Sequence, residues 1–446
     1  MAAHPPPAVS KSLSARAIMA ATAGNALEFY DFITYAFFAI QIGHAFFPKT
    51  SEFGSLMLSL ATFGAGFITR PIGGLVLGFY ADKVGRRAVM MLSFTMMGCA
   101  IIGIAIIPPY TAIGIAAPIL AVLCRLVQGF SLGGEVGPTT AYLMEAAPLK
   151  ARGLAVSWQS ASQSIAATTG ASIGVLLSAV MSTSALDSYG WRIAFLLGAV
   201  TLPFGLWIRR RLPETLHEEE PHAVTVTRAQ TRLGAVRESW RIIMLSLVVL
   251  AGGTISTYVF DYMTTYAQST LHFSATVGFA AGALGNLVGV GAVLWGGWLS
   301  DRIGRRPVMI WPNVAYLLMI YPLFVWIVSS GSPTVFLVVN IVLGFVSSVN
   351  AGAFYAAFAE TLPKSIRGGT FATIYATSIA TFGGTTQLVV TWLLKATGSP
   401  MAPAWYLLVA TAAATIAMYL ILESAPAQVT PHALDILPEL EPAHVR

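Results

Sequence analysis

The stretch GLVLGFYADKVGRR, residues 74–87, decides the fold because the chain contains it a second time. Residues 293–306 read VLWGGWLSDRIGRR, so Asp82 corresponds to Asp301. A second pair of segments follows at nearly the same spacing: AYLMEAAPLKARG at 141–153 and FYAAFAETLPKSIRGG at 354–369. Two motifs that recur in the same order at one spacing indicate a duplicated unit.

The composition places this duplicated unit in a membrane. Hydrophobic residues make up 56% of the chain and charged residues 10%, and the mean hydropathy is +0.73, whereas soluble domains are about 25% charged. Apolar runs of about 20 residues are needed to cross about 30 Å of hydrocarbon. The chain offers twelve, at approximately 17–46, 54–80, 88–108, 112–142, 153–183, 191–211, 241–267, 275–300, 307–328, 334–360, 369–395 and 403–422. The sequence therefore predicts an all-α protein with twelve transmembrane helices, built as two six-helix bundles related by a pseudo-twofold repeat.

The positive charges predict the orientation. Most Lys and Arg lie in the first sixteen residues or in alternate predicted loops, near 83–87, 150–152, 209–241, 302–306 and 364–367. The positive-inside rule places these segments, and both termini, in the cytoplasm. The expected parts are an N-tail 1–16, a six-helix bundle 17–211, a linker 212–240, a second bundle 241–422 and a C-tail 423–446. The net charge of +6 follows from this topology, and we expect no nucleic-acid partner.

Several short strings resemble a known superfamily. The GxxxDxxGRR form at 78–87 and 297–306, RLVQGFSLGGE at 125–135 and RRLPET at 210–215 resemble the major facilitator superfamily, over essentially residues 15–422. Within it, GNALEFYDF, ITRPIGG and SWQSASQ resemble the metabolite:proton symporter family, in particular its citrate and tricarballylate proton symporters. The resemblance implies the major facilitator fold and proton-driven uptake of an organic anion across a bacterial inner (plasma) membrane. It also implies that the protein is not an enzyme and needs no cofactor.

The predicted fourth helix carries a polar stripe in an apolar segment. One arc of about 100° on a helix holds Arg125, Gln128, Glu135, Thr139 and Tyr142. A guanidinium keeps its charge at any reasonable pH, so Arg125 needs an anionic partner. That partner is either Glu28 or Asp31 in a structural ion pair, or a substrate carboxylate, which the guanidinium fork binds with two hydrogen bonds.

Other candidate substrate contacts lie on neighbouring helices. Gln159 and Gln163 are four residues apart in SWQSASQS, so their amides share one helix face and suit carboxylates and hydroxyls. A role in joining two membrane helices is the alternative. Arg70 either extends its head group to the interface, pairs with an acid such as Glu135, or touches substrate. The remaining candidates are Asn25, Ser162, Tyr258 and Tyr355.

Proton coupling requires a carboxyl group that binds a proton in one state and loses it in another. An apolar cavity favours the neutral form of a carboxyl, and a neighbouring arginine favours the charged form. The candidates are Glu28, Asp31, Glu135 and Asp261. On the first helix one arc of about 120° holds Asn25, Glu28, Asp31 and Tyr35, with Phe32 inside it. Asp31 leads, with Glu28 as its structural or coupling neighbour. Asp261 alternatively biases the protein toward a less anionic substrate.

The duplicated loops suggest a gate. In the resembled superfamily they form an ion-pair latch that holds the two halves together at the cytoplasmic end. The alternative is simple anchoring of positive charge and termination of helices. The candidate gating residues are Asp82, Arg86, Arg87, Arg152, Asp301, Arg305, Arg306, Glu145, Glu360 and Arg367.

Other functions stay open from the sequence. A symporter of zwitterions such as proline or betaine, or of a shikimate-like monocarboxylate, would share the scaffold, as would a drug:proton antiporter. The short tail after Glu423 lacks the heptads typical of osmosensing members. An enzyme or channel is disfavoured, since the sequence has no nucleotide fingerprint, metal cluster or filter-like loop. We expect a monomer in the lipid bilayer, with an organic anion and a proton as its ligands and with no metal site.

Overall fold

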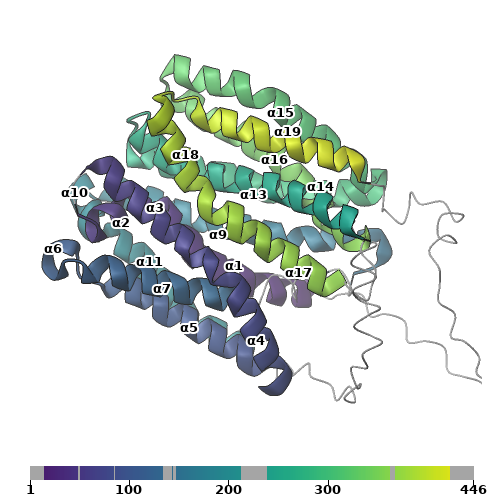
Figure 1. Ribbon diagram of the computed structural model, residues 1–446, viewed down its shortest axis with the longest axis horizontal. Helices are drawn as coiled ribbons and strands as arrows, with labels where there is room; N and C mark the ends of the chain where they lie inside the picture. The colour runs from purple at the N-terminus through teal and green to yellow at the C-terminus, as the bar shows by residue number, and fades with distance from the viewer. Residues whose placement is uncertain are drawn as a thin grey trace, which may run out of the picture.

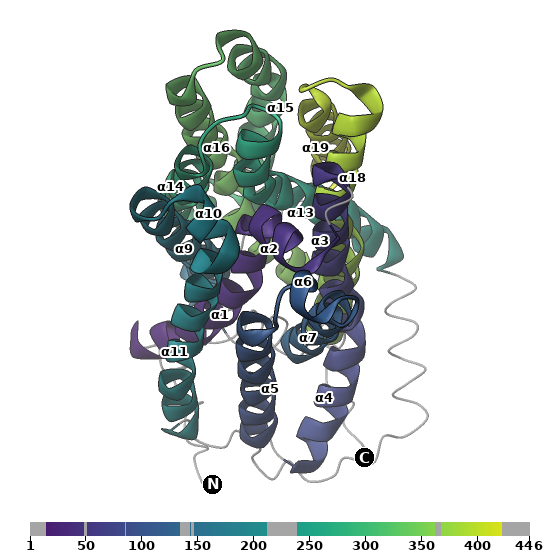
Figure 2. The same cartoon turned by 90° about the vertical axis from the view of Figure 1, so that its left-hand side faces the viewer.

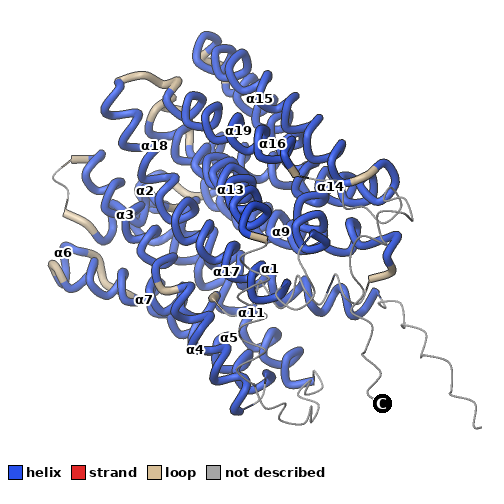
Figure 3. The backbone as a smooth tube through the Cα atoms, turned by 45° about the vertical axis from the view of Figure 1, so that its right-hand side comes forward, coloured by secondary structure: helices blue, strands red, loops and turns tan. Residues whose placement is uncertain are grey.

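The computed structural model describes residues 15–48, 51–84, 86–133, 143, 147–211, 239–361 and 367–421. Every regular element within these ranges is helical, as the uniformly blue elements of Figure 3 show. The all-α prediction is therefore confirmed. The predicted tails and linker, at 1–16, 212–240 and 423–446, lie almost entirely outside the described residues.

The N-terminal half fills the first six predicted spans. Its main helices are α1 (Ala15–Phe37), α2 (Ala39–Phe46), α3 (Glu52–Ile68), α4 (Arg70–Val84), α5 (Arg86–Ile106), α6 (Tyr110–Ile113), α7 (Ala116–Leu132), α9 (Arg152–Val180) and α11 (Trp191–Arg211). Short elements precede two of them: η1 (Leu149–Ala151), α10 (Thr183–Ala185) and η2 (Leu186–Gly190). Breaks at Phe38 and Thr69 divide two of the predicted spans into two consecutive helices each.

The C-terminal half fills the other six spans. Its elements are α13 (Trp240–Ser269), α14 (Ala275–Ile303), α15 (Arg305–Ser330), α16 (Pro333–Thr361), α17 (Arg367–Ser378), η3 (Ile379–Gly383), α18 (Gly384–Thr397) and α19 (Ala402–Leu420). Gly304, between α14 and α15, has φ +104°, a conformation that a residue with a side chain rarely adopts. This glycine belongs to the repeated DRIGRR segment, so the motif sets the turn between two helices.

The helices have the length and surface of membrane spans. Seven helical stretches of the described chain are each long and apolar enough to cross a bilayer. Large apolar side chains such as Phe79, Leu318 and Val409 are exposed on the outside of the bundle, as lipid contact requires. Within the described residues, each of the twelve predicted segments coincides with one helix or with consecutive helices, which confirms the predicted helical architecture.

The two halves meet along two equivalent seams. Figures 1 and 2 show the purple-to-blue N half against the green-to-yellow C half, with α9, α13, α3 and α18 between them. At one seam α9 packs on α14, and at the other α3 packs on α18. A Cβ on Gly64 of α3 would overlap the carbonyl oxygen of Gly384 in α18, so the second seam is a backbone contact. The sequence repeat relates α9 to α17–α18, and α3–α4 to α14. The contact of α3 with α18 is therefore the repeat equivalent of the contact of α14 with α9.

Side-chain contacts distinguish the two ends of the bundle. At one end, which we call the latch end, Asp301 meets Gly153 and Arg306 meets Tyr419. At the opposite end, which we call the far end, Gln41 meets Gln268 at 3.4 Å between Nε2 and Oε1. An opening of about 590 Å³ lies at the far end, lined by residues of α2, α3, α13 and α18.

Candidate functional site

Glycines hold two arginines at the centre of the N half. A Cβ on Gly129 of α7 would overlap the carbonyl oxygen of Gly66 in α3, and one on Gly133 would overlap that of Arg70. Small residues let membrane helices approach to backbone contact. These contacts fix Arg70, the first residue of α4, relative to Arg125 in the middle of α7.

Arg125 is completely buried. Its Nη1 donates to Gln128 Oε1 at 2.7 Å, and its Nη2 donates to the carbonyl oxygen of Phe63 at 3.4 Å. Its Nε has no hydrogen-bond partner, and no carboxylate of the described residues pairs with it. A buried charge is stable only with compensating partners, and among the described residues those of Arg125 are an amide oxygen, a carbonyl oxygen and aromatic rings.

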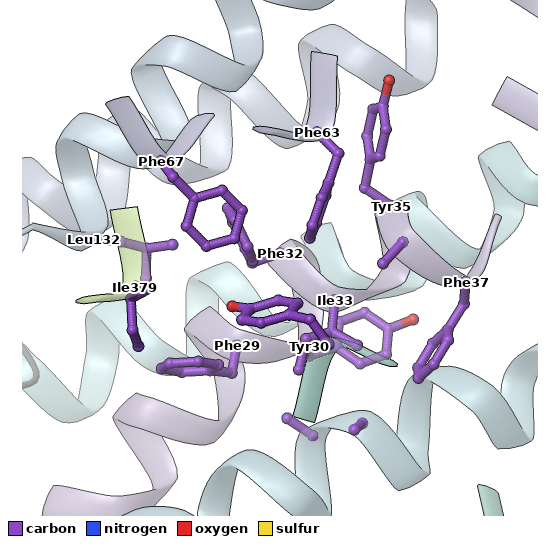
Figure 4. Packing of buried hydrophobic residues seen from close by; sticks show 14 of the residues in the cluster. Phe29, Tyr30, Phe32, Ile33, Tyr35, Phe37, Phe63, Phe67, Leu132 and Ile379 are labelled. Atoms are coloured by element: carbon purple, nitrogen blue, oxygen red, sulfur yellow. The ribbon is translucent and has the colours of Figure 1, made fainter. Parts of the chain in front are cut away.

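Aromatic rings surround both guanidinium groups. The Cζ atom of Arg125 lies 4.2 Å from the centroid of the Phe32 ring, and that of Arg70 lies 4.4 Å from the same centroid. Figure 4 shows Phe32 beside Phe63 and Phe67, which come from α3. Cation–π contacts contribute about 2 kcal/mol when desolvated. The two cations thus share one ring in the core.

An aromatic layer separates these arginines from the space between the halves. The ring of Tyr258, on α13, lies 6.1 Å from that of Phe63 and 5.5 Å from that of Phe67. Tyr258 lines a central cavity of about 160 Å³, but neither Arg70 nor Arg125 does. The arginines are therefore occluded in this conformation, and Tyr258 stands between them and the cavity.

The central cavity receives polar side chains from both halves. It is lined from the N half by Ser160 and Gln163, and from the C half by Tyr258, Asp261, Tyr355 and Tyr375, among others. Gln163 Nε2 donates to the Tyr375 hydroxyl at 3.4 Å across the interface. Of the residues proposed from sequence to contact substrate, Gln163, Tyr258 and Tyr355 thus meet in one cavity.

Three other sequence candidates form a buried hydrogen-bond network instead. Asn25 Nδ2 donates to Ser162 Oγ at 2.7 Å, and Gln159 Nε2 donates to Asn25 Oδ1 at 3.0 Å. All three are buried, and the network joins α1 to α9. Gln159 and Gln163 thus have different surroundings although the sequence predicts one row of amides. For Gln159, the structure favours the alternative of joining two helices.

Asp261 is the one proton-coupling candidate whose side chain is described. It is 2% exposed, lines the central cavity, and its Oδ2 has no hydrogen-bond partner. Asn286, on α14, lies within hydrogen-bonding reach of the carboxylate. The other three, Glu28, Asp31 and Glu135, have side chains outside the described residues.

The candidate latch is assembled within the C half and reaches α9. Arg305 donates from Nη1 to Asp301 Oδ1 at 2.6 Å, and from Nη2 and Nε to the two oxygens of Glu360 at 3.0 and 3.2 Å. Asp301 also accepts from the backbone N–H groups of Gly153 and Leu154, at 2.8 and 2.9 Å. A carboxylate at a helix N-terminus is stabilised by the helix dipole. The latch thus joins the halves by capping α9.

The other gating candidates have different outcomes. Arg306 donates to the carbonyl oxygen of Tyr419 at 2.7 Å, a contact within the C half. Arg152 begins α9, beside the capped residues. The side chains of the remaining candidates, Asp82, Arg86, Arg87, Glu145 and Arg367, lie outside the described residues.

Sequence reasoning did not select the aromatic residues around the arginines. Phe32 lay on the predicted polar arc of the first helix, but Phe63 and Phe67 read as ordinary apolar residues. The signal that could have found them is their spacing, because four residues apart they line one face of α3. Asn286 was also missed, since an isolated Asn in an apolar helix carries no pattern.

Comparisons with known proteins agree with this geometry. Residues 21–296 and 276–436 match the model of the Major Facilitator Superfamily. The chain is 38% identical to the citrate-proton symporter of Salmonella typhi over 92% of this chain and 94% of that one. It is 32% identical to the proline/betaine transporter of Salmonella typhimurium over 88% and 80% of the two chains. The crystal structure of a D-xylose-proton symporter is similar at a TM-score of 0.73 and 16% identity, over 92% and 98% of the chains.

Proposed function

The chain belongs to the major facilitator superfamily, and on that premise we propose that it imports a small organic anion with two or three carboxylates, such as citrate, together with protons. It is a multi-pass membrane transporter and not an enzyme. Transport is by alternating access, driven by the proton gradient without a bound cofactor. The substrate class is supported by the similarity to the citrate-proton symporter.

One observation carries the choice of substrate. Two buried guanidinium groups share the Phe32 ring, and Arg125 has no carboxylate partner among the described residues. One guanidinium binds one carboxylate with two hydrogen bonds. Two of them in one place suit a ligand with at least two carboxylates. Binding would replace part of the aromatic contact of Arg125 by a charged hydrogen bond.

The proton is carried by a carboxyl group inside the bundle. The candidates remain Glu28, Asp31, Glu135 and Asp261, and Asp31 leads, with Glu28 as its structural or coupling neighbour on α1. Protonation of a carboxylate near Arg125 would release the guanidinium to the substrate, so the two ligands would bind together. This order of events gives symport.

The latch supports a conformation that is closed at the latch end. Asp301 caps α9 there, while an opening of about 590 Å³ lies at the far end. With the latch end in the cytoplasm, as the Lys and Arg distribution favours, this is the state that admits substrate from outside. In this proposal the protein is a monomer in the inner (plasma) membrane of a bacterium. Both tails and the linker 212–240 lie in the cytoplasm.

Uptake into proteoliposomes tests this function. Labelled citrate should accumulate when the outside is acidic, and a protonophore should abolish the accumulation. Asp31→Asn, Glu28→Gln, Glu135→Gln and Asp261→Asn should each be compared with the parent protein, and the variant that lacks the proton carrier should no longer respond to the gradient. Uptake that is indifferent to the proton gradient, or coupled normally in all four variants, would contradict the proposed coupling.

A zwitterionic substrate is the second candidate. Asp261 places a negative group in the same cavity, and the proline/betaine transporter is a relative. Proline and betaine should then compete with labelled citrate, whereas the proposed function predicts that they do not. A shikimate-like monocarboxylate would use only one of the two arginines, and a cationic drug would be repelled by both.

A further inference from the structure

Asp261 is a buried acceptor whose second oxygen receives no hydrogen bond from the described residues. Its side chain is 2% exposed, and none of the described residues donates to its Oδ2. An unsatisfied buried group costs about 1–3 kcal/mol, and more when it is charged. A group that the fold keeps in this condition, facing a cavity, is matched to a donor that arrives from outside.

The neighbours of Asp261 do not supply that donor. Asn286 lies within hydrogen-bonding reach, but its Nδ2 also donates to the carbonyl oxygen of Gly282 at 3.0 Å. Farther along the cavity, Asn350 Nδ2 donates to Asn313 Oδ1 at 2.8 Å. These amide N–H groups thus already donate hydrogen bonds to oxygens of the protein. One oxygen of Asp261 remains for a ligand.

Tyr258 links Asp261 to the arginines. It precedes Asp261 by three residues of α13, about 4.5 Å along the helix axis, and both line the central cavity. Tyr258 is also within electrostatic reach of Arg70, Arg125 and Asp261. Because its ring stands between the arginines and the cavity in this conformation, a single small molecule held by the arginines and by Asp261 requires that ring to move aside.

We propose that Asp261 binds the hydroxyl group of a hydroxy-polycarboxylate substrate, so that the transporter selects hydroxy acids over the same acids without the hydroxyl. One free acceptor oxygen matches the single proton of a hydroxyl, whereas an ammonium group brings three donors and needs several acceptors. A site built around a polar contact rejects analogues that lack it, because its own buried group is then left unpaired. The named ligand class rests on the proposed function.

Two sets of probes isolate this contact on the purified full-length protein. Citrate and tricarballylate differ only by the hydroxyl, and malate, succinate and aspartate carry a hydroxyl, a hydrogen or an ammonium on one dicarboxylate skeleton. Dissociation constants are measured by titration calorimetry. Citrate should bind about tenfold or more tightly than tricarballylate, and malate likewise than succinate and aspartate, as expected for a hydrogen bond to a charged group.

Variants then assign the preference to the carboxylate. In Asp261→Val the ratio between citrate and tricarballylate should fall to about one. Asp261→Asn keeps the shape and an acceptor oxygen, so it should retain part of the ratio. Asp187→Asn is the matched control, because that carboxylate lies at the far end beside His44, at 3.3 Å from its Nδ1. It should keep the full ratio.

The outcomes separate this assignment from the proposed function. Equal binding of citrate and tricarballylate by the parent protein, an unchanged ratio in Asp261→Val, or a preference for aspartate over malate would each overturn the role of Asp261 while leaving a polycarboxylate transporter. Absence of binding by every acid would overturn both. Thermal melting of each variant shows whether a lost ratio comes from a lost fold.

Discussion

The two halves of this transporter build the same scaffold and place different chemistry on it. In the N half, α3 meets α7 where Gly66 lies against Gly129, and in the C half α14 meets α16 where Gly285 lies against Gly344. The sequence repeat relates one contact to the other. Both contacts let helix backbones approach closely. The duplication has therefore kept the packing of the ancestral unit.

The side chains carried by this scaffold differ in charge. Arg125 stands one turn before Gly129, and Asn340 stands one turn before Gly344. Asn340 donates to the carbonyl oxygen of Phe336 at 2.8 Å, within its own helix, whereas Arg125 faces the aromatic core. The C half instead contributes Asp261 and tyrosines. The repeat therefore determines how the helices pack, whereas the two halves contribute different side chains to substrate recognition.

The largest expected effect comes from removing the charge of the N half. Arg125→Gln should lower citrate uptake at least about a hundredfold, because a buried charge pair lost on one side costs about 2–5 kcal/mol. Arg192→Gln is the matched control, since Arg192 donates to the carbonyl oxygen of Ala105 at 2.6 Å and its Cζ lies 4.4 Å from the centroid of the Trp191 ring. Uptake rates in proteoliposomes measure both. If Arg125→Gln lowered citrate uptake only slightly, the charge of the N half would not be what distinguishes the two halves in substrate recognition.

The second effect concerns the shared scaffold. Gly129→Ala places a Cβ into the backbone of α3, whereas in Gly344→Ala the nearest atom, Gly285 O, is 3.0 Å away. Gly129→Ala should lower the melting temperature by several degrees and uptake roughly thirtyfold, because the core is overpacked and the arginine shifts. Gly344→Ala should have a smaller effect on both. Equal losses of melting temperature and uptake in the two variants would mean that both glycine contacts support the substrate site equally.

The third effect concerns the latch. Asp301→Asn removes the charge that Arg305 and the N-terminus of α9 share, so the closed latch end should become less stable by about 1–2 kcal/mol. Citrate uptake should fall roughly tenfold or less. Alkylation of Ser160→Cys in a background without Cys99 and Cys124 reports access to the cavity from the latch side. It should speed up with Asp301→Asn. An unchanged rate would show that the Asp301 contact does not close this end.

The smallest effect separates two amides on one helix. Gln163→Ala removes a long hydrogen bond to Tyr375, 3.4 Å, and should lower uptake by about two- to fivefold with little change in melting temperature. Gln159→Ala should instead mainly lower the melting temperature, because it opens the buried network with Asn25. The reverse pattern would place substrate against Gln159 rather than in the central cavity.

Sequence reasoning reached the fold and the identity of the charged residues, but not their surroundings. Twelve apolar segments and the duplicated motifs predicted the helices because both signals are local. Arg125 could be selected as a site residue because a charged side chain within an apolar membrane helix is costly and therefore indicates a function. The rings of Phe32 and Phe67 acquire their role only where α1, α3 and α7 meet, which no single segment encodes.

The same limit explains the amides and the acid of the C half. Gln159 and Gln163 share a face by helix geometry, yet α1 covers one and the cavity borders the other. Whether an oxygen of Asp261 is left without a donor depends on which acceptors the neighbouring side chains donate to. Such facts require coordinates, because they depend on three or more helices at once.

The central claim, that two arginines of the N half hold two carboxylates, is tested most directly by comparing butyrate with succinate. The two acids have the same carbon chain and differ by one carboxylate. Titration of the purified protein should show succinate binding at least about tenfold more tightly, and Arg125→Gln should abolish that advantage while Arg192→Gln keeps it. Equal affinity of the parent protein for butyrate and succinate would contradict the account.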